Sequence, residues 1–565
     1  MASTKGLPVE IFQQIYGYLG PKDFNAARRT CRAWMEASLD RSLLTVMLER
    51  GGWTGEDTSK GWQMLSCQLA RECALAPGRA GVETEAVFTK SSEVDFSGLR
   101  DSQVGGSSSE LIFTTSTCSR FLCVAQGALI RIYQLDAGRP VYMASVECPG
   151  RVLAMAMGPY GGSSRYAIAA ILEGRVGMVR KLAEEVFGHG PQEEEQERTQ
   201  FNTIDIVSNS ERISITGANN SALYEHNLVN QTWNLVEDDS TIYSDLGSED
   251  DPPRSVALCP QGQCVVFGCS EGLDVQWIDS PSGQSLHRWV PSTAPNDHVY
   301  VRPRRRPAHD SSNILRILSS PAHHANRPWL KRRLFPNAHW HGSSKYEIAS
   351  RQPNPTGYYD YDDDDYYYYY YNRIPLNDNG SHVLFVDQIS NRLVLGTDDL
   401  ARKIEFVPPT NGEAPPKLYR AAADMSQGAR IVAVYDDTII LYSVPRRVCR
   451  FSPTEGQPDG LLQHDTNHWL NWWDEPRANG ETGAVHHQEG PTWPLSLRGT
   501  RITTLANVCE ISVQTSPCLV ISAVTDAGKC EVWRFSKHEG GIGGGEDGRV
   551  SRGSLNQAFQ GKDCS

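Results

Sequence analysis

Pairs of short apolar runs separated by turn residues recur from about residue 110 to residue 537, and this repetition limits the possible folds strongly. Each unit is a strand, a turn rich in Gly, Asn, Asp or Ser, and a second strand that ends near a bulky residue. Such hairpins predict an all-β domain. The pairs are Phe121–Ala125 with Leu129–Tyr133, Tyr166–Ile171 with Val176–Val179, Arg212–Thr216 with Ala222–Tyr224, Cys264–Gly268 with Val275–Ile278, Arg392–Gly396 with Lys403–Phe406, Ile431–Tyr435 with Ile439–Tyr442, and Leu519–Ala523 with Glu531–Phe535.

One bulky residue near the end of each unit serves as a marker of the repeat. The first four markers are about 45 to 53 residues apart, near the ~40 to 45 residues of a propeller blade. The unit resembles the WD-repeat propellers, without their Trp-Asp and Gly-His signatures. We therefore expect seven blades over 110–537, and a pair of β-sandwiches is the alternative. The markers are Tyr133, Met178, Tyr224, Trp277, Ile404, Tyr442 and Trp533, and upstream strands are expected at Val152–Met157, Ser255–Cys259, Val383–Asp387 and Ile502–Ala506.

The first fifty residues have a different pattern, in which apolar side chains are spaced for short helices. Pro8 suits the first turn of a helix, because its missing N–H would be unpaired there. Ile11, Ile15 and Leu19 then recur every four residues until Gly20-Pro21 ends the run. The first helix is therefore expected to be amphipathic.

A second helix is expected to begin at an Asp23 N-cap, and a third apolar stretch covers Ser38–Leu48. A unit of roughly 40 residues seldom folds stably alone, so its apolar content suggests that a partner covers part of it. The stripe expected along the second helix is Phe24, Ala27, Cys31 and Trp34.

The leucine-proline start, the acidic residue at the second helix and the ending Cys31-Arg32-Ala33-Trp34 together resemble the F-box over residues 5–50. The resemblance implies docking onto the Skp-type adaptor of a cullin-RING (SCF) ubiquitin ligase. Ordinary core helices of an N-terminal subdomain, with Trp34 packed inside, are the alternative. The positions that the resemblance assigns to the adaptor are Leu7, Pro8, Ile11, Ile15, Leu19 and Trp34.

Length and composition indicate a protein of the cytosol or nucleus. No apolar run approaches the ~20 residues that span a bilayer, and the first residues lack the order of a secretory signal. The 14 cysteines are scattered through 565 residues, so we expect most to be reduced. The net charge of −13 argues against broad nucleic-acid binding.

Segments outside the repeats divide the rest of the chain. Residues 51–105 are expected to be a helical linker with Trp62, Leu65, Leu69 and Leu75 on one helix, which would hold the F-box at a fixed angle if it packed on the propeller. Insertions are expected at about 184–198, 291–373 and 452–498, and a disordered tail over 538–565.

The two longer insertions leave several interpretations open. Arg302–Arg306 could be a nuclear-localisation signal, a phosphate-binding patch or an exposed loop that pairs with the tyrosine-aspartate tract Tyr358–Tyr371. Clustered tryptophans in 452–498 either bind a partner or fold the insertion onto the propeller. His464 and His468 have the spacing of a metal pair without an HExxH pattern, so we predict no zinc site. The four tryptophans are Trp469, Trp472, Trp473 and Trp493.

Catalytic motifs, such as a phosphate-binding loop or a nucleophile elbow, are absent from the sequence. We therefore predict a non-catalytic receptor without cofactor or metal. Its F-box would bind the adaptor, and through it the cullin and RING subunits, while the propeller holds an unknown target protein for ubiquitination. A scaffold without a role in degradation is the alternative, and a propeller enzyme or lectin belongs to a different class. No residue is assigned to the substrate.

Overall fold

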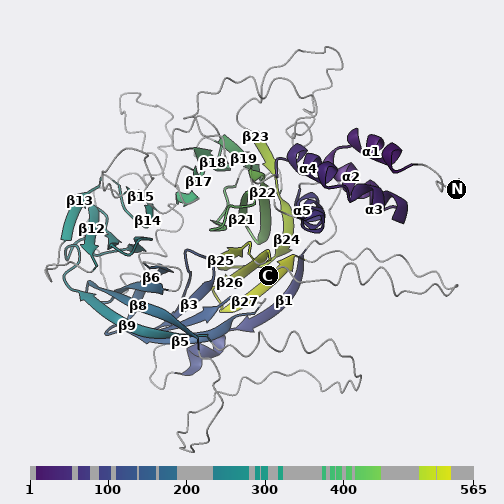
Figure 1. The fold of residues 1–565 in the computed structure, drawn as a ribbon. Coiled ribbons are helices and arrows are strands. Elements are labelled where there is room, and N and C mark those ends of the chain that lie inside the picture. Colours follow the sequence, from purple (N-terminus) through teal and green to yellow (C-terminus); the bar gives the residue numbers. More distant parts are fainter. Residues whose placement is uncertain are drawn as a thin grey trace, which may run out of the picture.

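The computed structural model has a helical N-terminal region followed by a β-rich body (Figure 1). Among the residues that it describes, no helix is long and apolar enough to cross a membrane. The described residues are 8–53, 61–76, 88–102, 110–135, 139–160, 165–186, 233–278, 287–292, 294–302, 316–321, 372–376, 382–387, 390–397, 403–409, 414–446, 495–516 and 518–535.

Two of the N-terminal helices begin at residues that suit a helix N-terminus, where the first backbone N–H groups have no partner within the helix. Pro8 is the N-cap of the first helix, and the Asp40 carboxylate accepts from the Leu43 N–H at the start of the fourth, at 2.9 Å. The helices are α1 (Val9–Gly17), α2 (Pro21–Ala27), α3 (Arg32–Ser38), α4 (Arg41–Arg50) and α5 (Trp62–Leu75).

Two details of the expected second helix are wrong. Gly20 is the N-cap of α2, and Pro21 is its first residue, because the missing proline N–H costs nothing at that position. Asp23 lies instead in the first turn, where its negative charge interacts favourably with the positive end of the helix dipole. The expected stripe is also divided between two helices, since the chain turns extended at Cys31 before α3 begins.

The described strands of the body form seven separate sheets. The first three are β2 (Leu111–Thr115), β3 (Phe121–Gln126), β4 (Leu129–Gln134) and β5 (Val141–Glu147); β6 (Val152–Pro159), β7 (Arg165–Leu172), β8 (Val176–Val186) and β9 (Trp233–Tyr243); and β10 (Ser255–Leu258), β11 (Cys264–Gly268), β12 (Gly272–Trp277) and β13 (His287–Pro291). The fourth is β14 (His298–Arg302) with β15 (Arg316–Ser320).

The last three sheets take strands from distant parts of the chain. They are β16 (Ile374–Leu376), β17 (His382–Val386), β18 (Leu393–Thr397), β19 (Lys403–Val407) and β23 (Leu495–Arg498); β20 (Leu418–Ala421), β21 (Ala429–Tyr435), β22 (Thr438–Val444) and β24 (Thr500–Thr504); and β25 (Val508–Gln514), β26 (Val520–Thr525), β27 (Lys529–Phe535) and β1 (Phe88–Asp95).

The expected hairpins that lie within the described residues are confirmed as antiparallel pairs. The first strand is buried throughout in four of these hairpins, which explains why these strands read as short apolar runs. The expected pair Arg212–Thr216 with Ala222–Tyr224 lies outside the described residues, as does its marker Tyr224. Directly before and after that gap, β8 pairs with β9.

The sheets contact one another in a cyclic order through the strand at one edge of each. These contacts run from β2 to β6, β10, β14, β16, β20 and β25, and then from β25 back to β2. Apolar clusters fill the space between neighbouring sheets, such as the cluster that joins Phe121 and Ile132 to Met155 and Ile168. The body is therefore held together between its sheets by side-chain packing.

The first departure from the sequence prediction is strand β1, which lies in the segment expected to be a helical linker. It pairs antiparallel with β27, with Phe88 opposite Phe535 and Asp95 opposite Lys529. A short 3-10 helix, η1 (Ser97–Ser102), follows it. The linker region thus supplies a strand to a sheet made from the end of the β-rich body.

The second departure concerns the strand expected at Ile502–Ala506, which was assigned to the last unit. The structure places β24 instead at the edge of the preceding sheet, against β22. Its neighbour in sequence, β23, pairs parallel with β19 of the sheet before that. The continuous segment 495–504 therefore joins two adjacent sheets.

The third departure lies in the insertion expected over 291–373. Two of its segments, β14 and β15, form an antiparallel sheet in which His298 pairs with Ser320. These residues of the expected insertion therefore form a two-stranded sheet. The tyrosine-aspartate tract, most of the basic cluster, the tryptophan-rich segment and the expected tail lie outside the described residues.

Candidate protein-binding surface

Helix α1 has one buried and one exposed apolar face. Phe12 and Tyr16 are only 3% and 0% exposed and point into the helical unit. Ile11 and Ile15 are 38% and 37% exposed, and Tyr18, just after the helix, is 90% exposed. At about 100° per residue these last three positions fall within one arc of about 60°. They form a continuous apolar strip, which we call the α1 strip.

The buried face of α1 holds Trp34 in place. The Tyr16 hydroxyl donates to the Trp34 carbonyl at 2.6 Å. The Trp34 ring meets Phe12 and Tyr16 edge-on at centroid distances of 5.2 and 5.3 Å. Burial raises the pKa of Tyr16 well above its usual value, so its hydroxyl keeps the proton that it donates. The α1 strip is thus supported from behind by fixed aromatic side chains.

The residues that the resemblance assigns to the adaptor divide into two groups. Pro8, Ile11 and Ile15 are exposed. Leu19 and Trp34 are partly buried and pack against the apolar cluster of the helical unit. Leu7 lies outside the described residues.

Tyr18 belongs to the α1 strip but was not among the predicted residues. It lies three residues after Ile15 and seven after Ile11, and both spacings place side chains on one helical face. The F-box resemblance, from which the adaptor residues were assigned, did not include it, although its spacing in the sequence could have indicated it. Val9, with 50% exposure, lies on another side of the helix.

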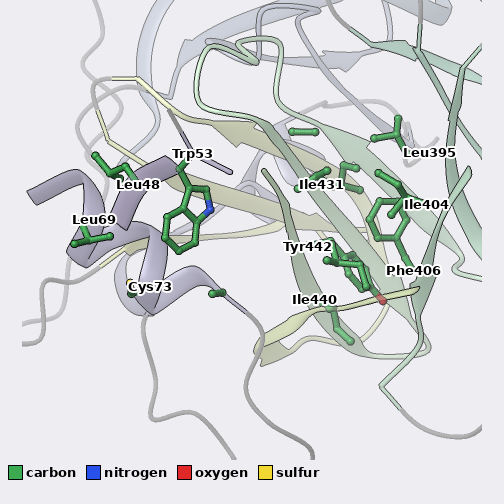
Figure 2. Close-up of a cluster of buried hydrophobic side chains, with 14 of the residues drawn as sticks. Leu48, Trp53, Leu69, Cys73, Leu395, Ile404, Phe406, Ile431, Ile440 and Tyr442 are labelled. Atoms are coloured by element: carbon green, nitrogen blue, oxygen red, sulfur yellow. The ribbon is translucent and has the colours of Figure 1, made fainter. Parts of the chain in front are cut away.

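Helix α5 connects the helical unit to the β-rich body. Its Leu65, Leu69 and Cys73 belong to one apolar cluster with residues of α1, α2 and α4. The same cluster continues into the strands β19, β21 and β22, as Figure 2 shows. The helices and two sheets of the body therefore share a single core.

The members of this shared core come from both regions. Helical members include Leu48, Trp53, Leu69 and Cys73, and strand members include Leu395, Ile404, Phe406, Ile431, Ile440 and Tyr442 (Figure 2).

A buried ion pair crosses the boundary between α5 and the body. Arg430 of β21 donates to the Glu72 carboxylate at 2.6 Å, and the two side chains are only 2% and 1% exposed. The same guanidinium donates to the Ser443 hydroxyl of β22. The preceding residue of α5, Arg71, donates to the Gln427 side chain. These contacts join distant parts of the chain, because Glu72 and Arg430 are 358 positions apart in the sequence.

Polar side chains also join the contacting edge strands of neighbouring sheets. Arg420 of β20 donates to the Glu510 carboxylate of β25 at 3.2 Å, and Thr115 of β2 donates to the same carboxylate at 2.6 Å. Three sheets are therefore connected through one carboxylate. Arg420 and Thr115 both bond to Glu510 across sheets. The cluster therefore holds neighbouring sheets of the body together.

Metal ligands do not gather in the part of the chain that the structure describes, where no group of three or more His, Cys, Asp or Glu could hold an ion. His464 and His468 lie outside that part. The described candidate surface is therefore the α1 strip on a helical unit that is fixed to the body through α5.

Comparison with known families also singles out the N-terminal helices that carry the α1 strip. A family model described as F-box-like matches residues 4–46, which contain α1 to α3 and the first part of α4. The N-terminal region is therefore an F-box-like domain, as the sequence motifs indicated. No curated protein matches the chain significantly.

Proposed function

We propose that this protein is a non-catalytic substrate receptor of an SCF-type ubiquitin ligase. Its F-box-like domain binds a Skp-type adaptor, which in turn connects it to the cullin and RING subunits. The β-rich body binds a target protein that is then ubiquitinated. The observation that carries this proposal is the F-box-like match over residues 4–46, on a unit whose α1 strip is exposed.

The α1 strip supports adaptor binding through its chemistry. Ile11, Ile15 and Tyr18 expose apolar surface on one side of a helix, which suits helix-in-groove recognition. A fixed aromatic layer of Phe12 and Trp34 lies behind the strip, so binding there would cost this layer little side-chain freedom. The exposed members are therefore suited to a partner surface.

The arrangement of sheets supports a propeller as the target-binding body. Seven sheets contact one another in cyclic order through their edge strands, and β1 joins a sheet built from the end of the body. A propeller of seven blades explains both features, because radial repetition protects strand edges and the last blade takes a strand from the other end of the domain.

The mechanism in this proposal is proximity. A target held on the body would be kept near the ubiquitin carrier that the cullin and RING subunits recruit, which raises the effective concentration of a target lysine. The Glu72–Arg430 pair and the shared core would hold the F-box-like domain at a fixed angle to the body. The ligation chemistry belongs to the partner enzymes, and we place the protein in the cytosol or nucleus with them.

A capture experiment with purified Skp-type adaptor tests the proposal. The full chain is compared with a variant that carries Ile11→Asp and Ile15→Asp. Both positions are exposed, so the variant should stay folded, while two charges in the apolar strip should abolish capture. Circular dichroism and thermal unfolding check that the variant is folded.

A matched control variant carries Val141→Asp and Ile242→Asp, which are 42% and 56% exposed on the body. This control should capture the adaptor as the natural chain does. A folded natural chain that captures no adaptor contradicts the ligase function. Capture without ubiquitination of any bound protein in a reconstituted ligase supports the scaffold alternative instead.

A further inference from the structure

Two cysteines face each other at one end of the sheet that contains β10 and β11. Leu258 pairs with Val265 in this antiparallel ladder, so the next pair is Cys259 with Cys264. The Cys259 N–H donates to the Cys264 carbonyl at 2.9 Å. Directly opposed residues lie about 4.5 to 5.5 Å apart at Cα. This spacing falls within the about 4.4 to 6.8 Å found in disulfides.

Both cysteines are buried, at 1% exposure each, at the base of a short turn. The Gly262 N–H donates to the Cys259 carbonyl at 2.8 Å, which closes the turn. Gly262 has φ of +72° and packs against Tyr160, where a Cβ would lie 2.7 Å from the ring. The Cys259 thiol contacts the side-chain oxygen of the exposed Gln261 at 3.2 Å. The dithiol therefore lies in an apolar cluster with Val266 and Val275, and Gln261 links the Cys259 thiol to the exposed part of the turn.

The two thiols also differ in acidity. A hydrogen bond from the Cys264 thiol lowers the pKa of Cys259 below its usual value, and backbone N–H groups of the turn add to this against the effect of burial. The same hydrogen bond raises the pKa of Cys264. Cys259 is thus the better nucleophile of the pair, because the thiolate is the reactive form.

We propose that Cys259 and Cys264 form a peroxide-sensitive dithiol that closes to a disulfide and locks this hairpin of the body. The Cys259 thiolate attacks one oxygen of hydrogen peroxide and the O–O bond breaks. Cys259 becomes a sulfenic acid, and the departing hydroxide takes up the proton that the thiol had released and leaves as water. The Cys264 sulfur then attacks the Cys259 sulfur, and the S–O bond breaks with loss of a second water. Two thiols are oxidised while one hydrogen peroxide is reduced to two waters.

Other buried cysteines provide internal controls, since their directly opposed residues are not cysteines. Cys530 is 0% exposed and lies between Val94 and Val524 in its sheet. Cys123 is equally buried and lies between Thr114 and Ile132. Both should remain thiols at peroxide concentrations that close the Cys259–Cys264 bridge.

The test uses the full chain with Cys269→Ser, because Ser255–Arg288 is one tryptic peptide that contains Cys259, Cys264 and Cys269. The reduced protein is treated with hydrogen peroxide, alkylated and digested. We expect the peptide to lose two hydrogens in mass and to resist alkylation until it is reduced. Cys530 should stay alkylated throughout. Amide hydrogen exchange in the turn should slow in the oxidised protein.

Two single variants, Cys259→Ser and Cys264→Ser, should each abolish the mass change in this peptide. If either variant fails to fold, the Cys269→Ser protein still decides, because only one internal bridge is then possible in the peptide. Full alkylation of both cysteines at peroxide doses that oxidise free glutathione overturns the proposal. A bridge from either cysteine to a different cysteine overturns it as well.

Discussion

The helical N-terminal region, α1 to α5, presents two sides that differ in chemistry. On the outer side, Ile11, Ile15 and Tyr18 leave apolar surface open to solvent. On the side toward the body, Glu72 and Arg430 form a buried ion pair inside a continuous apolar core. Apolar groups are therefore exposed on one side, while charged groups are buried on the other.

This difference indicates which contact is permanent. A buried charge pair is costly to separate, because each charge would remain without its partner in a poorly solvated site. An exposed apolar strip costs little to keep free and gains stability when a partner covers it. The α5 boundary is thus part of the fold, whereas the α1 strip is the surface that the proposed adaptor would cover.

The largest effect is expected from breaking the α5 boundary with Glu72→Ala. The change leaves the Arg430 charge buried without its carboxylate, which should lower the free energy of unfolding by about 3 to 5 kcal/mol. Urea unfolding followed by fluorescence measures the loss. The double variant Glu72→Leu with Arg430→Met should recover much of this stability, and a double variant as unstable as the single one contradicts the assignment.

The next effect should appear in adaptor binding. Tyr18→Ala removes a ring that is 90% exposed, so it should leave the stability unchanged within about 0.5 kcal/mol. If the ring is an anchor of the α1 strip, adaptor binding should weaken by about 2 to 4 kcal/mol in titration calorimetry. Tyr142→Ala, which alters a tyrosine that is 54% exposed on β5, should leave adaptor affinity unchanged.

A smaller effect is expected where segment 495–504 joins two sheets beneath the helices. A Cβ at Gly499 would lie 2.3 Å from Ile440 and 2.8 Å from Tyr442, so Gly499→Ala should overpack the shared core. We expect a loss of about 1 to 3 kcal/mol in urea unfolding. A Gly174→Ala change tests the opposite case, in which no atom lies within 4 Å and only the φ of +85° is unfavourable. Equal losses would argue against close packing at Gly499.

The smallest effect should come from an exposed ion pair on the F-box-like unit itself. Arg32 and Glu36 lie 2.7 Å apart, with side chains that are 75% and 60% exposed. Glu36→Ala should change the free energy of unfolding by no more than about 0.5 kcal/mol, because water screens the pair. A loss as large as that of Glu72→Ala would remove the proposed contrast between exposed and buried pairs.

The local parts of this structure could be predicted because their patterns are local. The hairpin from Phe121 to Tyr133 alternates strands and a turn within a few residues, and α1 repeats its apolar side chains every four residues. Both signals come from side chains whose neighbours in space are also neighbours in sequence. The predicted adaptor residues came from the F-box resemblance, and the same helical pattern contains two of its exposed members, Ile11 and Ile15.

Other parts could not be predicted, since their partners are far away in sequence. Strand β1 is mostly polar and exposed, and only its pairing with β27 makes it a strand. The parallel pairing of β19 with β23 depends likewise on a distant segment. The break between α2 and α3 was missed for another reason. The helical spacing of apolar residues continues across Cys31, whereas the backbone is extended there.

The sequence by itself determined the helical start, the hairpins and the F-box-like motif, because periodic burial and turn residues act over short distances. Tertiary structure alone decided which strands share a sheet and which face of α1 stays open. It also decided that Glu72 meets Arg430, 358 positions away. Such contacts depend on the packing of whole elements, since a single charged residue in a sequence does not indicate which opposite charge will be buried beside it.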